Sequence, residues 1–303
     1  MRHIQLTGDA VVGGLSYDEL DRRTRSGTLR RVRRGAYEPA ALSTPDPAEQ
    51  HLSLIEGTLR QTPTPAIVSH MSAAVLHGLP SWNDDLVRVH LTRDNGGKGK
   101  IRRYVHLHVA PLPAADLCVI EGMAVTSLGR TVVDLCRTLP MRRAVAIGDT
   151  ALASGLPVAE LADVAARCLG WPGMANARQS LEFLDARSES VGESVSRVAM
   201  WEVGVATPIP QYEVADLDGR FVGRSDFGWP EFRTLGEFDG RIKYGRLLDD
   251  GQTAGDVIVD EKRREDAMRE LGWQIVRWLW EDLRHPQLLR ERLERAFARG
   301  LAR

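Results

Sequence analysis

The stretch of residues 220–244, RFVGRSDFGWPEFRTLGEFDGRIKY, constrains the fold most, because one short turn signal separates two runs of strand-forming residues. The residues from Phe221 to Phe227 are expected to form one strand, and those from Glu231 to Phe238 the antiparallel strand that returns. Gly228-Trp229-Pro230 is expected to be the turn between them, since Gly and Pro favour connections. The sequence therefore predicts a β-hairpin in this stretch.

Three acids and one lysine accompany the predicted hairpin: Asp226, Glu237, Asp239 and Lys243. Asp226 and Glu237 stand at the ends of the two strands, and Asp239 falls on the same side as Glu237 because alternate residues share a face. Carboxylate oxygens are the ligands that Mg²⁺ prefers, and a lysine can stabilise developing negative charge or orient an attacking water. The pattern favours a metal site, and the alternative is a charged hairpin on the surface.

The surroundings of the hairpin predict the element order αβββαβα. The remaining elements are expected at residues 188–203 (helix), 211–215 (strand), 257–271 (helix), 273–279 (strand) and from 282 onward (helix). With Asp226, the segment GEFDG that contains Glu237, and Lys243-Tyr244, this order resembles the PD-(D/E)XK nuclease superfamily, specifically its very-short-patch-repair-like (Vsr-like) endonuclease branch. The resemblance covers residues 187–303.

This resemblance implies a restriction-endonuclease-like domain that cleaves DNA with Mg²⁺ as cofactor. It implies Asp226 and Glu237 as metal ligands, with Glu193 as a supporting acid of the first helix. The superfamily pattern has lysine two residues after the second acid, where this chain has Asp239. Either Lys243 supplies the ammonium group from a displaced position, or Asp239 is a third ligand, or the fold binds DNA without cutting it.

The N-terminal residues 1–42 are expected to form a small winged helix-turn-helix. Ser16 and Glu19 have capping-box spacing for a helix over 16–26, and the segment LRRVRRGAY then reads as a ribbon. No acid lies between Arg22 and Tyr37. Arginines at this density are typical of a module that neutralises DNA phosphates, and a solvated charged face is the alternative. We expect base contacts from the helix and backbone contacts from the ribbon, which assigns DNA binding to Arg22, Arg23, Arg25, Arg30, Arg31, Arg33 and Arg34.

Residues 27–37 also match the run G-x-L-x-R-V-x-R-G-x-Y. This run resembles the N-terminal winged helix of type IV toxin–antitoxin antitoxins of the AbiEi family, and the segment SHMSAAVLHGL resembles their central part. The resemblance implies transcription regulation by binding to the promoter of the protein's own operon, and a possible cognate toxin as partner. A non-catalytic autorepressor or antitoxin is therefore the alternative to a Mg²⁺-dependent DNA endonuclease.

An α/β middle domain is expected over 46–155, followed by a helical connector over 156–186. It contains a predicted helix over 67–76 and two strands, 86–92 and 105–109, joined as a hairpin by the basic loop 94–100. His70 and His77 are seven residues apart on the predicted helix, and His106 and His108 alternate on one strand. Neither pair has a third ligand in view, so we assign the histidines structural positions.

The whole chain, 303 residues with a net charge of −1, is expected to be an α+β multidomain protein. Its three cysteines lack metal or disulfide spacing. No signal-like or membrane-length apolar run occurs, so we expect a cytoplasmic protein with double-stranded DNA as partner and no membrane association.

Overall fold

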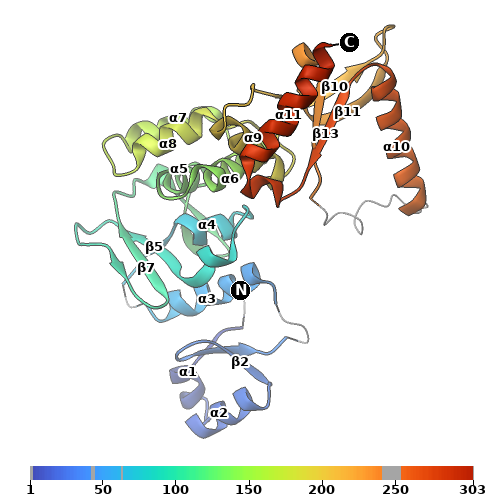
Figure 1. Ribbon diagram of the computed structural model, residues 1–303. Coiled ribbons are helices and arrows are strands. Elements are labelled where there is room, and N and C mark those ends of the chain that lie inside the picture. Colours follow the sequence, from blue (N-terminus) through green and yellow to red (C-terminus); the bar gives the residue numbers. More distant parts are fainter. Residues whose placement is uncertain (1–2, 42–44, 63, 241–253, 303) are drawn as a thin grey trace. The chain divides into compact units, whose positions relative to one another are not determined.

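The computed structural model describes residues 3–62, apart from 42–44, and residues 64–240 and 254–302 (Figure 1). The chain divides into two compact units, residues 1–139 with 156–181 and residues 140–155 with 182–303. Helix α6 (Met141–Ala153), placed by sequence at the end of the middle domain, belongs to the second unit. Helices α7 (Val158–Arg167) and α8 (Met174–Glu182), placed by sequence in the connector, lie almost wholly in the first unit.

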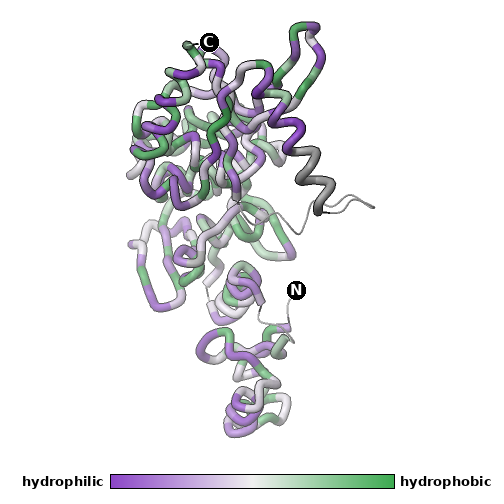
Figure 2. The backbone as a smooth tube through the Cα atoms, turned by 45° about the vertical axis from the view of Figure 1, so that its right-hand side comes forward, coloured by the Kyte–Doolittle hydropathy of each residue, from purple (hydrophilic) through white to green (hydrophobic). Residues whose placement is uncertain are grey.

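The first unit begins with a small three-stranded sheet of order β1-β3-β2 beside two helices. The elements are β1 (Gln5–Leu6), α1 (Thr7–Val12), α2 (Tyr17–Arg25), β2 (Leu29–Arg33) and β3 (Ala36–Pro39). Ser16 caps α2 by accepting the Glu19 N–H at 3.1 Å, as its spacing predicts. The core of this part is small and consists of Ala10, Leu20, Leu29 and Tyr37, with Leu15 packed against them. Figure 2 shows hydrophilic residues interspersed along this part of the chain.

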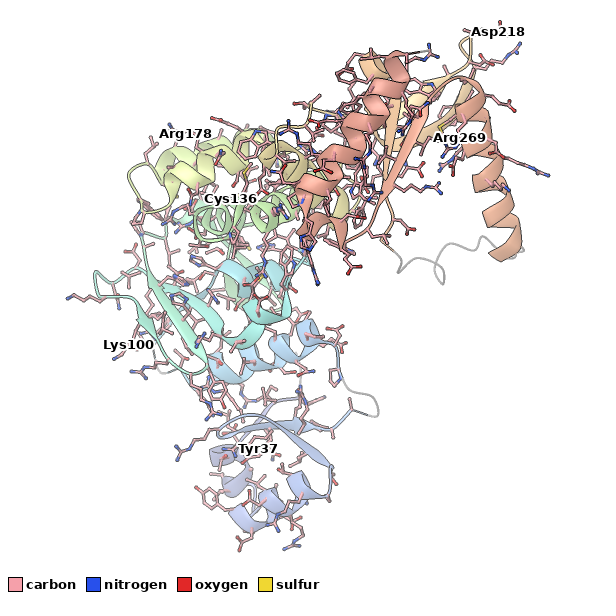
Figure 3. The ribbon with its side chains drawn as sticks, viewed as in Figure 1. Tyr37, Lys100, Cys136, Arg178, Asp218 and Arg269 are labelled. Atoms are coloured by element: carbon pink, nitrogen blue, oxygen red, sulfur yellow. The ribbon has the colours of Figure 1, made fainter. Side chains whose placement is uncertain are left out.

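The rest of the first unit is built on a six-stranded sheet of order β6-β7-β5-β4-β9-β8. Its strands are β4 (Ile67–Val68), β5 (Val89–Arg93), β6 (Lys100–Ile101), β7 (Val105–Val109), β8 (Leu117–Ile120) and β9 (Met123–Thr126). Helix α3 (Pro47–Arg60) has a full capping box between Asp46 and Glu49. Helices α4 (His70–Leu76) and α5 (Leu128–Thr138) complete the unit with α7 and α8. Figure 3 shows Lys100 at the β6 edge of this sheet.

Two expectations for this region are wrong. Strands β5 and β7 pair in parallel and do not form a hairpin. The segment that connects them in sequence contains β6, which pairs antiparallel with β7. The helix expected over 67–76 is divided at Ser69 into strand β4 and helix α4. Val68 is fully buried in the sheet core, and its pairing with Leu91 outweighs the helical pattern.

The second unit holds α6 and a four-stranded sheet of order β10-β11-β12-β13, in which β12 and β13 run parallel. Its remaining elements are α9 (Val191–Glu202), β10 (Ile209–Ala215), β11 (Phe221–Trp229), β12 (Thr234–Phe238), α10 (Ala254–Glu270), β13 (Gln274–Trp278) and α11 (Pro286–Leu301). From α9 onward the observed order is αβββαβα, as the sequence predicts. The sheet core includes Val214, Leu235 and Met268.

The turn of the β11–β12 hairpin lies later than expected. Gly228 and Trp229 continue β11, a 3-10 turn occupies Pro230–Phe232, and β12 begins at Thr234. The strand is longer because Trp229 is fully buried, with its indole N–H donating to the Ala206 carbonyl at 2.7 Å. A buried tryptophan with a satisfied N–H stabilises extended backbone that the neighbouring Gly and Pro would otherwise turn.

None of the helices in the described residues combines the length and apolar character needed to cross a membrane. Cys118, Cys136 and Cys168 are all free thiols.

Candidate functional site

Asp226 and Glu237 stand next to each other where β11 and β12 separate. The last register pair of these strands is Phe227 with Gly236, and one step further along the same register places Asp226 opposite Glu237. The Asp226 carboxylate accepts the backbone N–H of Phe238 at 2.8 Å. Asp226 therefore bridges the end of the ladder through the backbone of Phe238.

Glu237 is engaged by two arginines. Its carboxylate lies 2.7 Å from Nε of Arg277 and 3.5 Å from a terminal nitrogen of Arg264, and 13% of its side chain is exposed. Arg277 also pairs with Glu265 at 3.0 Å. Burial raises the pKa of Glu265, but its bonds to Arg269 and the charge of Arg277 outweigh that and lower the pKa. The described part of α10, which carries Arg264, Glu265 and Arg269, is strongly hydrophilic (Figure 2).

The carboxylate of Glu193 has a structural role at the start of α9. The side chain is buried and accepts hydrogen bonds from the Glu189 N–H (2.9 Å), the Ser190 hydroxyl (2.7 Å) and the Gln211 amide (2.7 Å). Ser190 in turn accepts the Glu193 N–H at 3.2 Å, so the two residues form a reciprocal cap at the start of α9. Three donors already stabilise this charge without a metal.

Two of the acids predicted to bind Mg²⁺, Glu237 and Glu193, are already held by partners within the protein. The backbone N–H of Asp239 donates to the Trp278 carbonyl at 2.9 Å, and Lys243 lies outside the described residues. Among the described side chains, no three carboxylates bring an oxygen each to within 4.8 Å of one another. Because Mg²⁺ needs open oxygen ligands, the arginines on Glu237 would have to move before it entered.

The seven arginines of the N-terminal part separate into two groups. Four have partners: Arg22 and Arg23 each lie 2.8 Å from Glu19, Arg30 pairs with Glu38, and Arg33 donates to the Thr58 hydroxyl at 2.5 Å. Glu19 and Glu38, the acids that pair with three of these four, flank the arginine-rich stretch in sequence. Exposed ion pairs of this kind are weak and exchange readily, and Arg22 remains 73% exposed.

Arg25, Arg31 and Arg34 form the second group. All three are exposed, and none of them makes an ion pair with another described residue. They come from the last residue of α2, the middle of β2 and the β2–β3 turn. The Arg34 carbonyl accepts the side-chain amide of Gln61 at 3.1 Å, which ties this turn to the residue after α3. These three guanidinium groups are available to an anionic partner.

Four histidines, His70, His90, His106 and His108, lie together in the first unit. His90 on β5 pairs in register with His106 on β7, and His108 follows two residues later on the same strand. His70, at the start of α4, stacks on His108 with ring centroids 3.7 Å apart. His77 lies apart from them and donates from Nε2 to the Thr126 carbonyl at 2.8 Å.

Burial lowers the pKa of all four clustered imidazoles. Burial, followed by the neighbouring histidines, lowers the pKa of His90 to about 3 and that of His108 to about 2. Burial also takes the pKa of His70 well below 6.5 and lowers that of His106. The sequence signal was the His-x-His spacing on β7. This spacing alone does not reveal the cluster, because His90 joins it through the parallel pairing with β5 and His70 from the start of α4.

No family model matches this chain. Two proteins of Mycobacterium tuberculosis, uncharacterized protein MT2308 of strain CDC 1551 / Oshkosh and uncharacterized protein Rv2248 of strain ATCC 25618 / H37Rv, are each 29% identical over 288 residues. Each match covers 94% of this chain and 98% of the relative. The crystal structure of RV2827C protein from Mycobacterium tuberculosis covers 70% of this chain and 83% of its own, with 16% identity and a TM-score of 0.39. A structural likeness of that degree carries no argument about function.

Proposed function

We propose that this chain is a double-stranded DNA-binding protein that docks through its N-terminal helices and three-stranded sheet. The observation that carries the proposal is the set of three exposed arginines without an ion-pair partner among the described residues: Arg25, Arg31 and Arg34. Cations of this kind bind phosphates and release counterions from DNA. Arg22 and Arg23 on α2 can exchange Glu19 for phosphate, since both are exposed enough to reach it. Arg30 and Arg33 contribute less because their partners are more buried.

The role that fits this mode of binding is transcription regulation, as an autorepressor or as the antitoxin of a toxin pair. The arginine run that resembles AbiEi antitoxins supports it, and so does the ion-paired state of Glu237, which suits a fold that holds DNA without cutting it. A cognate toxin remains part of this proposal. Co-purification with the product of a neighbouring gene tests that part separately from DNA binding.

Fluorescence anisotropy with the duplex upstream of the protein's own gene tests the DNA proposal. The triple variant Arg25→Ala, Arg31→Ala, Arg34→Ala should bind more weakly, and its salt dependence should have a slope smaller by about 2 to 3. A matched control replaces three exposed arginines from elsewhere, Arg178, Arg284 and Arg295. Equal affinity and slope for wild type and the arginine triple variant would reject the proposal.

A second candidate function is metal-dependent DNA cleavage by the second unit. It is favoured by the αβββαβα order and by the placement of Asp226 and Glu237 at the open end of the β11–β12 ladder. Incubation of supercoiled plasmid with Mg²⁺ or Mn²⁺ tests it, beside the double variant Asp226→Ala, Glu237→Ala. Cleavage by wild type that the double variant lacks would establish the activity. No cleavage with either metal would leave the binding role alone.

A further inference from the structure

The cluster of His70, His90 and His108 has the composition of a transition-metal site. Among the His, Cys, Asp and Glu side chains of the described residues, these three form the group in which each member has a ligand atom within 4.8 Å of those of the others. They come from three different elements, the start of α4, β5 and β7. We propose that His70, His90 and His108 bind one divalent transition-metal ion, with Zn²⁺ as the preferred ion.

The spacing of the nitrogens is close to what zinc requires. Imidazole nitrogens bind zinc at about 2.0–2.1 Å, so two ligands at a tetrahedral ion stand about 3.3 Å apart. Nδ1 of His90 and Nε2 of His108 lie 3.0 Å apart, and one ring nitrogen from each of the three histidines lies within 4.8 Å of the others. Closing the site requires the His70 side chain to turn, because its ring stacks face to face on that of His108 and the in-plane lone pairs of stacked rings do not point at one ion.

The rings are oriented by hydrogen bonds from outside the cluster. Nδ1 of His70 lies 3.0 Å from the Ser69 hydroxyl, which accepts from Thr92 at 2.7 Å, and both hydroxyl residues are fully buried. If Ser69 accepts from Nδ1–H, the Nε2 lone pair of His70 is free for a metal. Partners of this kind fix the tautomer and orientation of metal-binding histidines.

The backbone of His90 is fixed by a second chain of hydrogen bonds. Its N–H donates to the Ser72 hydroxyl at 2.8 Å, and that hydroxyl lies 2.8 Å from Nε2 of His51. Nδ1 of His51 lies 2.9 Å from the Leu86 carbonyl, so it carries the proton, and Nε2 accepts from Ser72. These hydrogen bonds connect α3 and α4 to β5 at His90.

The backbone at His70 carries strain that a packing role does not explain. His70 has φ of +50°, a left-handed conformation uncommon outside glycine. Strained backbone tends to occur where a side chain must be aimed at a ligand. Here it directs the buried ring of His70 against His108, and the two rings stack face to face, with 12° between their planes.

The donor set decides the class of metal and leaves one position open. Three neutral imidazoles suit Zn²⁺, Co²⁺ or Ni²⁺ and exclude Mg²⁺ as a preferred ion, because Mg²⁺ takes oxygen ligands. With three protein ligands and no acid among them, the fourth position is left for water or an anionic group. His106 stands beside the trio, 4.0 Å from His108 between ring centroids, and outside the group of three.

Titration of the metal-free full-length chain with Zn²⁺ and with Co²⁺ tests the proposal. We expect one ion per chain by calorimetry, and an intense visible absorption of Co²⁺ typical of tetrahedral coordination. The double variant His90→Ala, His108→Ala should lose both signals, and His285→Ala, which removes an exposed histidine of the second unit, should keep them. The wild-type cobalt spectrum stands even if a histidine variant does not fold.

The ligand assignment has its own control in His106→Ala. This variant should still bind one Zn²⁺ and keep the tetrahedral cobalt spectrum, whereas His70→Ala should reduce affinity by tenfold or more. Absence of Zn²⁺ and Co²⁺ binding by wild type, or unchanged binding by the double variant, overturns the proposal. Loss of binding in His106→Ala with retention in His70→Ala overturns the assignment of ligands. The DNA-binding arginines are not altered in any of these variants, so the two proposals fail separately.

Discussion

The carboxylate of Glu237 on β12 lies 2.7 Å from the guanidinium of Arg277, its register partner on the parallel strand β13. Arg264 of α10 approaches the same carboxylate at 3.5 Å. The acid that the sequence assigns to a divalent cation is therefore held by two cations of the protein. This arrangement decides whether the second unit can take up a metal.

Replacing Arg277 by Gln should strengthen divalent-cation binding at the end of β12. Removal of one guanidinium leaves the Glu237 charge less compensated, and the effect should be largest at low ionic strength, where screening is weak. Isothermal titration of wild type and Arg277→Gln with Mn²⁺ measures it, and we expect an increase in affinity of about tenfold, the equivalent of about 1.4 kcal/mol. The double variant Arg277→Gln, Glu237→Gln is the control and should lose the gain. Identical affinities in wild type and Arg277→Gln would show that Glu237 takes no part in cation binding.

The close approach of α9 to the end of β12 should make Gly192 intolerant of a side chain. A Cβ at this position would overlap the ring of Phe238, which packs edge-on against Trp280 with centroids 5.0 Å apart. Gly192→Ala should lower the free energy of unfolding by about 1–3 kcal/mol, despite the better helix propensity of alanine. Urea unfolding followed by tryptophan fluorescence measures the change.

Gly240→Ala is the matched control for that substitution. A Cβ at Gly240 would meet the same ring at 3.6 Å, an ordinary contact, so we expect almost no loss of stability. Equal stability of the two variants would mean that Phe238 moves aside at little cost.

The second unit could be predicted from its sequence in more detail than the first. Alternating strands and a helix with a capping serine indicate the αβββαβα order, since those signals are local. The end of β11 could not be predicted, because burial of Trp229 depends on Phe297 of α11, a contact far away in sequence. Lys243, which the superfamily resemblance needs, lies outside the described residues.

The histidine cluster could not be predicted because it depends on one topological choice. Read as a hairpin, β5 and β7 run antiparallel, and no pattern then sets His90 beside His106 and His108. The short edge strand β6 makes β5 and β7 parallel, and a long glycine-rich loop gives no local sign of that choice. The ion pairs of the seven arginines could not be predicted from the arginine-rich run either. Glu19 and Glu38, which pair with three of them, lie just outside that run.

Replacing Arg130 should destabilise the first unit strongly. The guanidinium is buried and lies 2.8 Å from both Asp116 and Asp134, two carboxylates that are themselves buried. Arg130→Met would leave both acids short of a partner, although Arg137 and Arg167 still reach them at 2.7 and 2.6 Å. We expect a loss of about 3–5 kcal/mol in the free energy of unfolding, because uncompensated buried charge is costly.

The control for Arg130 is an exposed pair of the same chemistry. Arg295→Ala removes a partner of Glu291 on the surface of α11, where 61% of the arginine and 60% of the glutamate side chain are exposed. Such pairs contribute less than about 1 kcal/mol. A loss for Arg130→Met no larger than that for Arg295→Ala would contradict the role assigned to the buried network.

Acid should destabilise the first unit through His51. Burial lowers the pKa of His51 to about 4 from its ordinary value of 6.5, and the hydrogen bond to the Leu86 carbonyl only partly opposes this. Between these pH values the unfolded chain binds the proton and the folded chain does not. The free energy of unfolding is therefore at its full value above pH 6.5 and falls as the pH drops toward 4, with about 3 kcal/mol from this group.

His51→Gln isolates that contribution, because an amide can replace both hydrogen bonds without titrating. Urea unfolding of both proteins at pH 7.5, 6, 5 and 4.5 measures it. EDTA keeps metal ions away, so that the neighbouring histidines titrate in the same way in wild type and variant. The stability difference between wild type and His51→Gln should shrink or reverse in sign as the pH falls, since only wild type loses the His51 share. A difference that stays constant from pH 7.5 to 4.5 would show that His51 is protonated in the folded protein at the same pH as in the unfolded chain.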